Sequence, residues 1–305
     1  MPQFIQTFIN SFLSYWDYLF YIITHPFSKD NYFYLLIVIS LFVWFIEILN
    51  PWRKNQKIFR KSFWQDAFFM FFNFFLFNLF FFIAFSEITE NYFLKVTAYF
   101  GLSPNGIISL NHMPLLFQFL VYFLVSDFIQ WCIHRFLLHN IPFLWKFHKV
   151  HHSATEMGFA THFRYHWMET MIYKSTLYIF LAWIFHFELK YVFFLHGFNI
   201  LVGHLNHSNI KLDYGILKFI FNNPKMHIWH HAKEYPISHP NGVNFGITLS
   251  LWDYLFKTIY IPYEGTNVKL GFKGIESYPK SFYRLMFEPF KRKKRNEARH
   301  KKVKS

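Results

Sequence analysis

The sequence is poor in cysteine and in acidic residues, and both shortages exclude classes of protein. A single cysteine, Cys132, rules out an internal disulfide. It also argues against a structural zinc site, which takes about four ligands and usually includes cysteine. Asp and Glu number 17 against 31 Lys and Arg, a formal net charge of +14. The basic residues cluster beside apolar segments and at the C-terminus, which disfavours nucleic-acid binding and favours a membrane surface.

The N-terminus lacks the marks of a cleavable signal peptide. Residues 4–24 have neither a basic start nor a small-residue cleavage site. Phe4, Phe8, Phe12 and Trp16 recur near the helical period, with polar residues between them. We therefore expect residues 1–30 to contain an amphipathic helix that lies at a membrane interface.

Apolar and aromatic residues, in contrast, are abundant. Hydrophobic residues make up 53% of the chain and aromatic residues 25%, with 46 Phe. Phe is favourable at the centre of a membrane helix, where lipid does not penalise its exposure. Apolar runs at 32–49, 67–85 and 114–133 approach the ~20 residues that a bilayer requires, and shorter runs at 171–187 and 189–203 are typical of a helical hairpin. The pattern predicts an all-α integral membrane protein with a bundle of about four to five membrane helices.

The charges of the loops predict an orientation. The loop 51–62 holds five Lys or Arg and no acid, so we expect it in the cytosol, whereas the loop 86–112 holds one Lys and two Glu. Counting forward places 134–166 and 205–305 in the cytosol, including the tail from Lys291 with its nine basic residues. The chain then divides into an interfacial segment, membrane helices with their loops, a histidine-rich region and a basic tail, at 1–30, 31–112, 113–262 and 263–305.

Histidines are concentrated on the expected cytosolic side. Of the 18 histidines, 15 fall between residues 134 and 239. They form four blocks, which are HRFLLH at 134–139, HKVHH at 148–152, GHLNHSN at 203–209 and HIWHH at 227–231. A lone histidine at an interface is usually a polar anchor, but so many imidazoles together would leave buried nitrogens unpaired if no ligand were bound. We therefore expect a metal site.

Helical spacing indicates how these blocks converge. Positions i, i+3 and i+4 share a helix face, so the three histidines of each HxxHH block are expected to point the same way. His134 and His139 are five residues apart, and they converge only where the helix ends or distorts. Asp127 lies seven residues before His134, on the same face, where it would accept the free ring N–H of a metal-bound imidazole.

The number of histidines predicts the number of ions. Eight or nine imidazoles exceed the needs of one tetrahedral ion and fit two ions of higher coordination. Imidazole binds zinc, copper, iron and nickel alike, so the ligand type leaves the metal open.

At these blocks the sequence resembles the fatty acid hydroxylase/sterol desaturase superfamily of membrane di-iron enzymes. The pattern HxxxxH, HxxHH, a later histidine and HxxHH is present in order. The flanking text WKFHKVHHSATEM, FRYHWME and NFGITLSLWDYLFKT is similar to the bacterial sterol desaturase-like branch, over about 115–262. The resemblance implies membrane helices capped by a cytosolic, histidine-rich helical domain, and location in a bacterial inner membrane.

The resemblance also implies a ligand set. It assigns the metal to nine histidines, namely His134, His139, His148, His151, His152, His207, His227, His230 and His231. His204 is a tenth candidate, but related 2-hydroxylases carry HxxxH where this chain has Gly203 and His207. His166 and Glu169 are expected beside the ligands or near the substrate mouth. The family's Arg-x-His-Pro is Arg-Tyr-His-Trp at 164–167, so the local turn is expected to differ.

The chemistry that the resemblance implies is oxidation of a lipid. Two iron ions and O2 would hydroxylate or desaturate a sterol-like or fatty acyl substrate, with electrons from an external donor such as a cytochrome b5 or a ferredoxin. No flavin, haem or ferredoxin motif is fused to the chain. Alternatives within the family are an alkylglycerol-type ether monooxygenase and a carotenoid hydroxylase.

A metal transporter is the alternative from another class. Transport predicts ionisable residues at mid-span, but the runs 32–49 and 67–85 offer only Glu47 near an end, together with Asn73 and Asn78. The histidines instead lie at the expected cytosolic ends, which favours catalysis. The complete set of histidine blocks also argues against a degenerate, non-catalytic member of the family.

Overall fold

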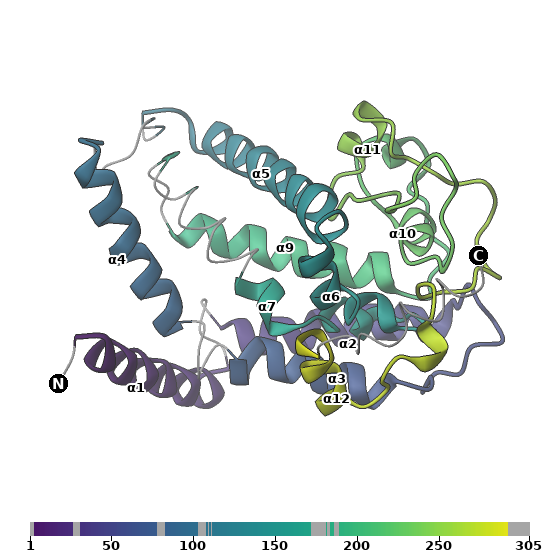
Figure 1. Cartoon of the computed structure of the whole chain (residues 1–305), viewed down its shortest axis with the longest axis horizontal. Helices are drawn as coiled ribbons and strands as arrows, with labels where there is room; N and C mark the ends of the chain where they lie inside the picture. Colours follow the sequence, from purple (N-terminus) through teal and green to yellow (C-terminus); the bar gives the residue numbers. More distant parts are fainter. Residues whose placement is uncertain are drawn as a thin grey trace, which may run out of the picture.

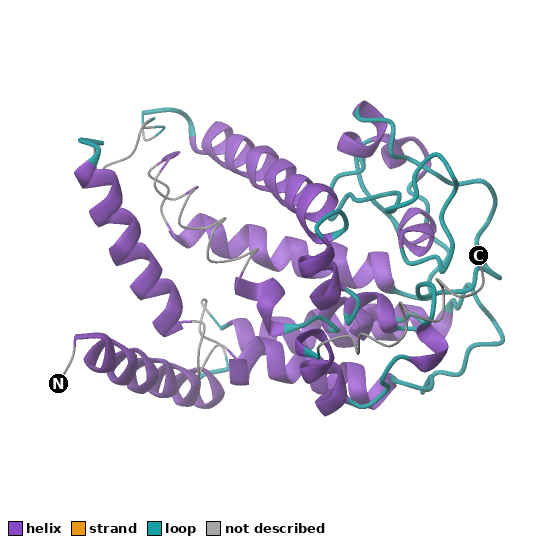
Figure 2. Ribbon diagram, in the orientation of Figure 1, coloured by secondary structure: helices purple, strands orange, loops and turns teal. Residues whose placement is uncertain are grey.

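A computed structural model describes most of the chain, as residues 3–26, 31–77, 83–102, 108, 110, 112–171, 181, 184–185 and 189–291. Within these ranges the protein is all-helical (Figure 2), and its β-structure is limited to isolated bridges such as the one between Pro51 and Ile210. The all-α class expected from the sequence is therefore confirmed. The basic tail beyond Lys291 and most of the predicted 171–187 run lie outside the described residues.

Long helices make up one half of the molecule (Figure 1). They are α1 (Gln3–Thr24), α2 (Tyr32–Leu49), α4 (Ile83–Tyr99), α5 (Leu115–Cys132) and α9 (Leu189–His207). Helix α3 (Phe63–Phe71) runs directly into a π-helical turn, η1 (Phe72–Leu76). Helix α2 begins where the Asn31 side chain accepts a hydrogen bond from Tyr34 N, and it ends just before Pro51, as the steric clash before a proline requires.

One continuous helix among the described residues is both long enough and apolar enough to cross a membrane. It runs from Leu115 to Leu138, because α5 continues through the π-helical turn η3 (Ile133–Leu138). Phe33–Leu49 is apolar but shorter. The predicted run 67–85 divides between α3, η1 and the start of α4, with residues 78–82 outside the description. A bundle of four to five membrane helices therefore stays a prediction.

Short helices and loops form the other half, on the right in Figure 1, where α10 and α11 lie beyond the ends of α5 and α9. Many polar side chains of these segments are buried, and the β-structure of the described residues is limited to isolated bridges. Its elements are α6 (Pro142–His148), η4 (His151–Ser153), η5 (Phe159–Phe163), α7 (Trp167–Thr170), η7 (Gly215–Phe219), α10 (Pro224–His230), α11 (Leu251–Leu255), η8 (Ile275–Ser277), α12 (Phe282–Phe287) and η9 (Glu288–Phe290).

One buried carboxylate joins the two halves. Asp66 on α3 accepts from Arg60 Nη2 at 2.6 Å and from Arg164 Nε at 2.5 Å, and all three side chains are nearly inaccessible to solvent. The Thr161 hydroxyl on η5 donates to the same carboxylate at 3.1 Å. A buried carboxylate is costly unless charged partners and hydrogen bonds satisfy it, and here both oxygens are satisfied.

We predict that Asp66→Ala destabilises the protein by about 3–5 kcal/mol, because two buried arginines lose the carboxylate with which both form ion pairs. Thermal unfolding of the detergent-purified protein would measure the loss as a lower Tm. Glu264→Gln is the matched control, because it breaks the 2.9 Å ion pair with Lys225 on the surface. The control should change stability by less than about 1 kcal/mol. Equal effects of the two substitutions would contradict the role of Asp66.

Candidate metal centre

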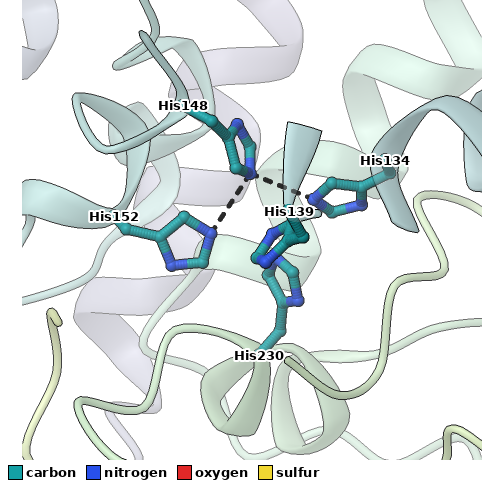
Figure 3. Close-up of side chains that lie close together, drawn as sticks. All are labelled: His134, His139, His148, His152 and His230. Atoms are coloured by element: carbon teal, nitrogen blue, oxygen red, sulfur yellow. Dashed lines mark hydrogen bonds between the residues drawn. The ribbon is translucent and has the colours of Figure 1, made fainter. Parts of the chain in front are cut away.

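Nine buried histidines form two groups whose ring nitrogens converge. The first group consists of His134, His139, His148, His152 and His230, with one nitrogen of each ring within 4.8 Å of the others. Figure 3 shows these five rings turned toward a common centre. The second group consists of His151, His207, His227 and His231, by the same distance. The nine are the residues proposed as ligands from the sequence, and the structure brings all of them together.

The end of the α5 helix explains how His134 and His139 meet. Residues five apart lie on different faces of an α-helix, but η3 is a π-helical turn with i→i+5 hydrogen bonds. His139 N donates to His134 O at 3.2 Å, and the two ring centroids are 5.0 Å apart. The distortion that the spacing required is therefore present in the structure.

The two HxxHH blocks are divided between the groups, which the sequence reasoning missed. We expected each triad to converge on one site. Instead, His148 and His152 join the first group while His151 joins the second. In the other block, His227 and His231 join the second group while His230 joins the first. In the first block α6 ends at His148, so His151 and His152 lie in the following turn, whereas in the second block α10 continues through His230. Around a helix, residue i+4 lies about 40° to one side of residue i and residue i+3 about 60° to the other side, so between two adjacent groups residue i+3 faces the opposite one.

Hydrogen bonds to backbone carbonyls fix the protons of several rings. Nδ1 of His151 lies 3.1 Å from Arg164 O, and Nδ1 of His207 lies 2.7 Å from Gly203 O. A carbonyl oxygen only accepts, so each Nδ1 carries the proton and each Nε2 presents a lone pair. The two Nε2 atoms nevertheless lie 3.2 Å apart. Two facing lone pairs repel, and a metal ion bound by both would turn this contact into coordination. The donor set therefore fits a metal.

Unpaired nitrogens support the same fit. His139 Nε2, His152 Nδ1, His230 Nε2 and His231 Nδ1 are buried and lack a hydrogen-bond partner. Each such nitrogen costs about 1–3 kcal/mol in an apolar interior. For His139 and His230, Nδ1 bonds to the carbonyls of Asn241 and Val243, so the unpaired Nε2 is the atom available for a metal.

Burial keeps the rings neutral. It lowers the pKa of His151 to about 3, and it lowers the pKa of His148, His152, His227 and His231 well below the usual value. Neighbouring imidazoles lower the pKa of these rings further, because charges so close together repel. A neutral imidazole is the form that binds a metal, so these ligands need no deprotonation at neutral pH.

Glu169 is the acidic partner of the first group. Its carboxylate accepts from His148 Nδ1 at 2.7 Å, and both side chains are buried. Burial raises the pKa of Glu169 to about 8, and a bound dication would favour the ionised form. His166, the other residue expected nearby, caps α7, where its backbone N donates to Glu169 Oε1 at 3.3 Å and its Nε2 bonds to Met286 O at 2.9 Å. Its ring packs against Phe147 and Phe290.

Asp127 has partners other than the one expected for it. Its carboxylate accepts from Trp252 Nε1 at 2.8 Å and from Thr248 N at 3.2 Å. The ring of His134 bonds instead to Phe245 O at 2.7 Å, so a carbonyl takes the place that we assigned to Asp127. The segment that carries this carbonyl is held by Asp253, whose oxygens accept from Phe245 N and Gly246 N at 2.9 and 2.7 Å. Both aspartates thus position the loop behind the ligands.

His204 lies beside the second group without joining it. Its Nε2 is 3.0 Å from Ser40 Oγ, and its Nδ1 is 3.3 Å from His162 Nδ1. A side chain at Gly203 would collide with His162, because an added Cβ would lie 2.3 Å from that ring. The ring of His162 thus occupies the space that a side chain at position 203 would need. Ser40 and His162 were not predicted, since no spacing rule connects them to the histidine blocks.

A cavity of about 170 Å³ opens over both groups. His134 and His148 line it from the first group, and His151, His207 and His227 line it from the second. Its exposed surface is mostly apolar, with contributions from residues such as Phe163 and Ile200. A pocket that is largely apolar and ends on a few convergent polar groups is typical of a site for a small molecule or a lipid.

Comparison with known proteins agrees with this geometry. Residues 119–258 match the fatty acid hydroxylase family. The chain is 29% identical to an ornithine lipid hydroxylase of Rhizobium tropici over 64% of this chain and 56% of that protein. It is 30% identical to the human alkylglycerol monooxygenase over 48% of this chain and 31% of that protein. A very-long-chain aldehyde decarbonylase of rice (Oryza sativa) is 28% identical over 46% of each. No solved structure matches the chain.

Residues 119–258 therefore form a fatty acid hydroxylase domain, and the resemblance seen in the sequence is confirmed. The matched region contains all nine converging histidines. The chain spans only about half of the ornithine lipid hydroxylase and about a third of the human monooxygenase. The names of those two relatives identify them as oxidoreductases that act on lipids.

We predict that Glu169→Gln lowers metal affinity about 10–100-fold, because the charge that polarises His148 is lost while the shape is kept. Competition with a graded series of chelators would measure the change. His239→Ala is a suitable control, because the half-buried ring of His239 bonds to Ser238 Oγ and Lys257 O and to no histidine of either group among the described residues. Unchanged affinity in Glu169→Gln would contradict its role.

We also predict different outcomes for two neighbouring histidines of α9. His207→Ala should remove one metal ion from each chain, because the second group would keep three of its four ligands. His204→Ala should leave the metal content unchanged, since its nitrogens bond to Ser40 and His162. Elemental analysis of the purified variants measures both. Loss of an ion from His204→Ala would make it a ligand after all.

Proposed function

We propose that the protein is a membrane-bound di-iron oxidoreductase that uses O2 to hydroxylate or desaturate a lipid. The observation that carries this proposal is the pair of histidine groups beneath one largely apolar cavity. Five and four imidazoles are more than two tetrahedral zinc sites with a water ligand would use. Iron accepts higher coordination by imidazole, and when bound it supplies the redox chemistry with O2 that zinc lacks.

The side chains of the protein would bind and orient the substrate and would shield the reacting carbon from water. His134, His148, His151, His207 and His227 present their rings at the base of the cavity, which places the substrate next to both groups. Carbonyls of Phe245, Arg164 and Gly203 hold ring orientations by accepting Nδ1–H. The buried surroundings keep water away from the reacting carbon, which suppresses side reactions.

The bilayer is the proposed source of the substrate. The Leu115–Leu138 helix is apolar enough to cross a membrane, and it ends at the first group of histidines. The cavity would therefore lie near the membrane surface, where a lipid enters sideways. We assign this side to the cytosol, because the basic loop 51–62 packs there through Arg53, whose Nη2 donates to Met157 O at 2.8 Å. An inner-membrane location in a bacterium and an external electron donor, such as a cytochrome b5 or a ferredoxin, complete the proposal.

The names of the relatives guide the choice of substrate. The names of the ornithine lipid hydroxylase and of the alkylglycerol monooxygenase each indicate a lipid with a polar part as the substrate of that relative. We infer a polar membrane lipid here, with an ether lipid as the first alternative and a carotenoid ring as the second.

The test combines metal analysis with product analysis. Detergent-purified protein loaded with ferrous iron should hold two irons per chain, and with a chemical reductant it should convert a lipid from total membrane extract. Isotopically labelled O2 would appear in a hydroxylated product, whereas desaturation would remove two hydrogens without adding label. His151→Ala should abolish turnover and lose an iron. A chain that holds no iron after loading, or turnover that survives His151→Ala, would refute the proposal.

A further inference from the structure

Buried polar atoms without a partner are few, and their positions are informative. Among the described residues eight side-chain atoms are of this kind, and four of them belong to the histidine groups. Two of the remaining four, Asn206 Oδ1 and Thr170 Oγ1, belong to residues that line the cavity over the histidines. Proteins rarely leave such atoms unpaired without a reason, and a ligand is one such reason.

Asn206 offers an acceptor that cannot rotate away. Its Nδ2 donates to Ile247 O at 2.8 Å, so the amide is fixed and Oδ1 is left without a donor. The residue is 1% exposed and lies directly before His207 on α9. An amide oxygen can only accept, so a partner at this atom must bring an O–H or N–H.

Thr170 lies near the first histidine group, through its neighbour Glu169. It ends α7, directly after Glu169, whose carboxylate holds His148. The side chain is 2% exposed, and its hydroxyl has no partner, although a threonine hydroxyl both donates and accepts. Asn206 and Thr170 thus approach one cavity from the second and the first histidine group.

Another amide of the cavity wall, that of Asn199, differs from Asn206. Asn199 Oδ1 already accepts from Thr248 Oγ1 at 3.0 Å, so its oxygen is satisfied within the protein. Among the described residues that line the cavity, Thr170 and Asn206 are those with a buried, unpaired side-chain oxygen, and they directly follow Glu169 and precede His207 in the chain. A bare methylene chain in the cavity would bury both atoms permanently, at about 1–3 kcal/mol each.

We propose that the substrate carries a hydroxyl or an amide N–H close to the carbon that is oxidised, and that Asn206 and Thr170 bind this polar group. This inference rests on the proposed function, and it narrows the substrate to lipids oxidised beside their polar part. Oxidation in the middle of an acyl chain, or on a carotenoid ring carbon remote from any hydroxyl, would leave both atoms unpaired. Asn206 and Thr170 act as specificity-determining residues, because they orient the substrate without touching the metal.

The first experiment identifies where the new oxygen goes. Purified, iron-loaded protein is incubated with total lipid extract, a reductant and isotopically labelled O2, and the products are located by tandem mass spectrometry. We expect the modified carbon to lie within about three bonds of a hydroxyl or an amide N–H, the reach of one side-chain hydrogen bond. A product modified in mid-chain would overturn this inference while leaving the proposed function intact. No oxidised product at all would overturn both.

The second experiment uses matched variants on the product's parent lipid. Thr170→Val keeps the shape of threonine and removes the hydroxyl, so kcat/KM should fall about 10–100-fold through loss of the substrate's partner. Thr170→Ser restores a hydroxyl and should recover most of the loss. Asn206→Leu should act like Thr170→Val.

Iron content separates binding from folding in this experiment. Each variant should keep the wild-type number of irons per chain, because neither side chain bonds to a ring nitrogen. On the same lipid with its hydroxyl or amide nitrogen methylated, the wild type should fall to the level of Thr170→Val. If methylation costs the wild type nothing, or if Thr170→Ser is as slow as Thr170→Val, the polar group is not bound by these residues.

Discussion

Imidazole nitrogens that face one another with lone pairs repel, and this protein holds two such pairs among the nine rings of its histidine groups. His151 and His207 hold their Nε2 atoms 3.2 Å apart, and so do His134 and His148. Burial keeps several of the rings neutral by lowering their pKa, so protonation does not relieve the contact. A bound cation does relieve it, and the surrounding structure serves to hold the rings in place until one is bound.

The surrounding carboxylates show how this is done. Asp253 holds the loop whose Phe245 carbonyl orients His134, while Asp66 holds Arg164, whose carbonyl orients His151. Glu169 bonds directly to His148. In each case a buried acid is connected to a histidine of the two groups through one or two hydrogen bonds. The acid itself accepts hydrogen bonds from more than one donor. Such networks give precise geometry because every member has few alternatives.

Histidines of both groups line the same cavity, so the proposed metal site and the proposed substrate site share residues. Five rings from both groups line the cavity floor. Asn206 and Thr170, which also line this cavity, are next to His207 and Glu169 in the chain, so backbone segments that position the histidine groups also form part of the cavity wall.

Much of the site could be predicted from the sequence, because local spacing carries it. The HxxHH blocks, the HxxxxH block and the later histidine identified all nine converging residues, and the five-residue spacing required the helix distortion that η3 provides. Glu169 was placed near the ligands by its neighbours in the chain. The number of membrane helices stays a prediction, because part of the apolar run 67–85 lies outside the described residues.

Tertiary structure alone decided how the histidines are shared. Spacing places the three rings of a block near one helix face, but His151 and His230 each face the group opposite to that of their block neighbours, because the two groups lie side by side. Tertiary structure also decided that His134 bonds to Phe245 O rather than to Asp127, and that His204 bonds to Ser40. These partners are separated by more than 100 residues in sequence, and no local pattern encodes a contact of that range. The sequence by itself determined which residues have the chemistry to bind a metal, whereas packing between distant segments determined which of the two groups each of them joins.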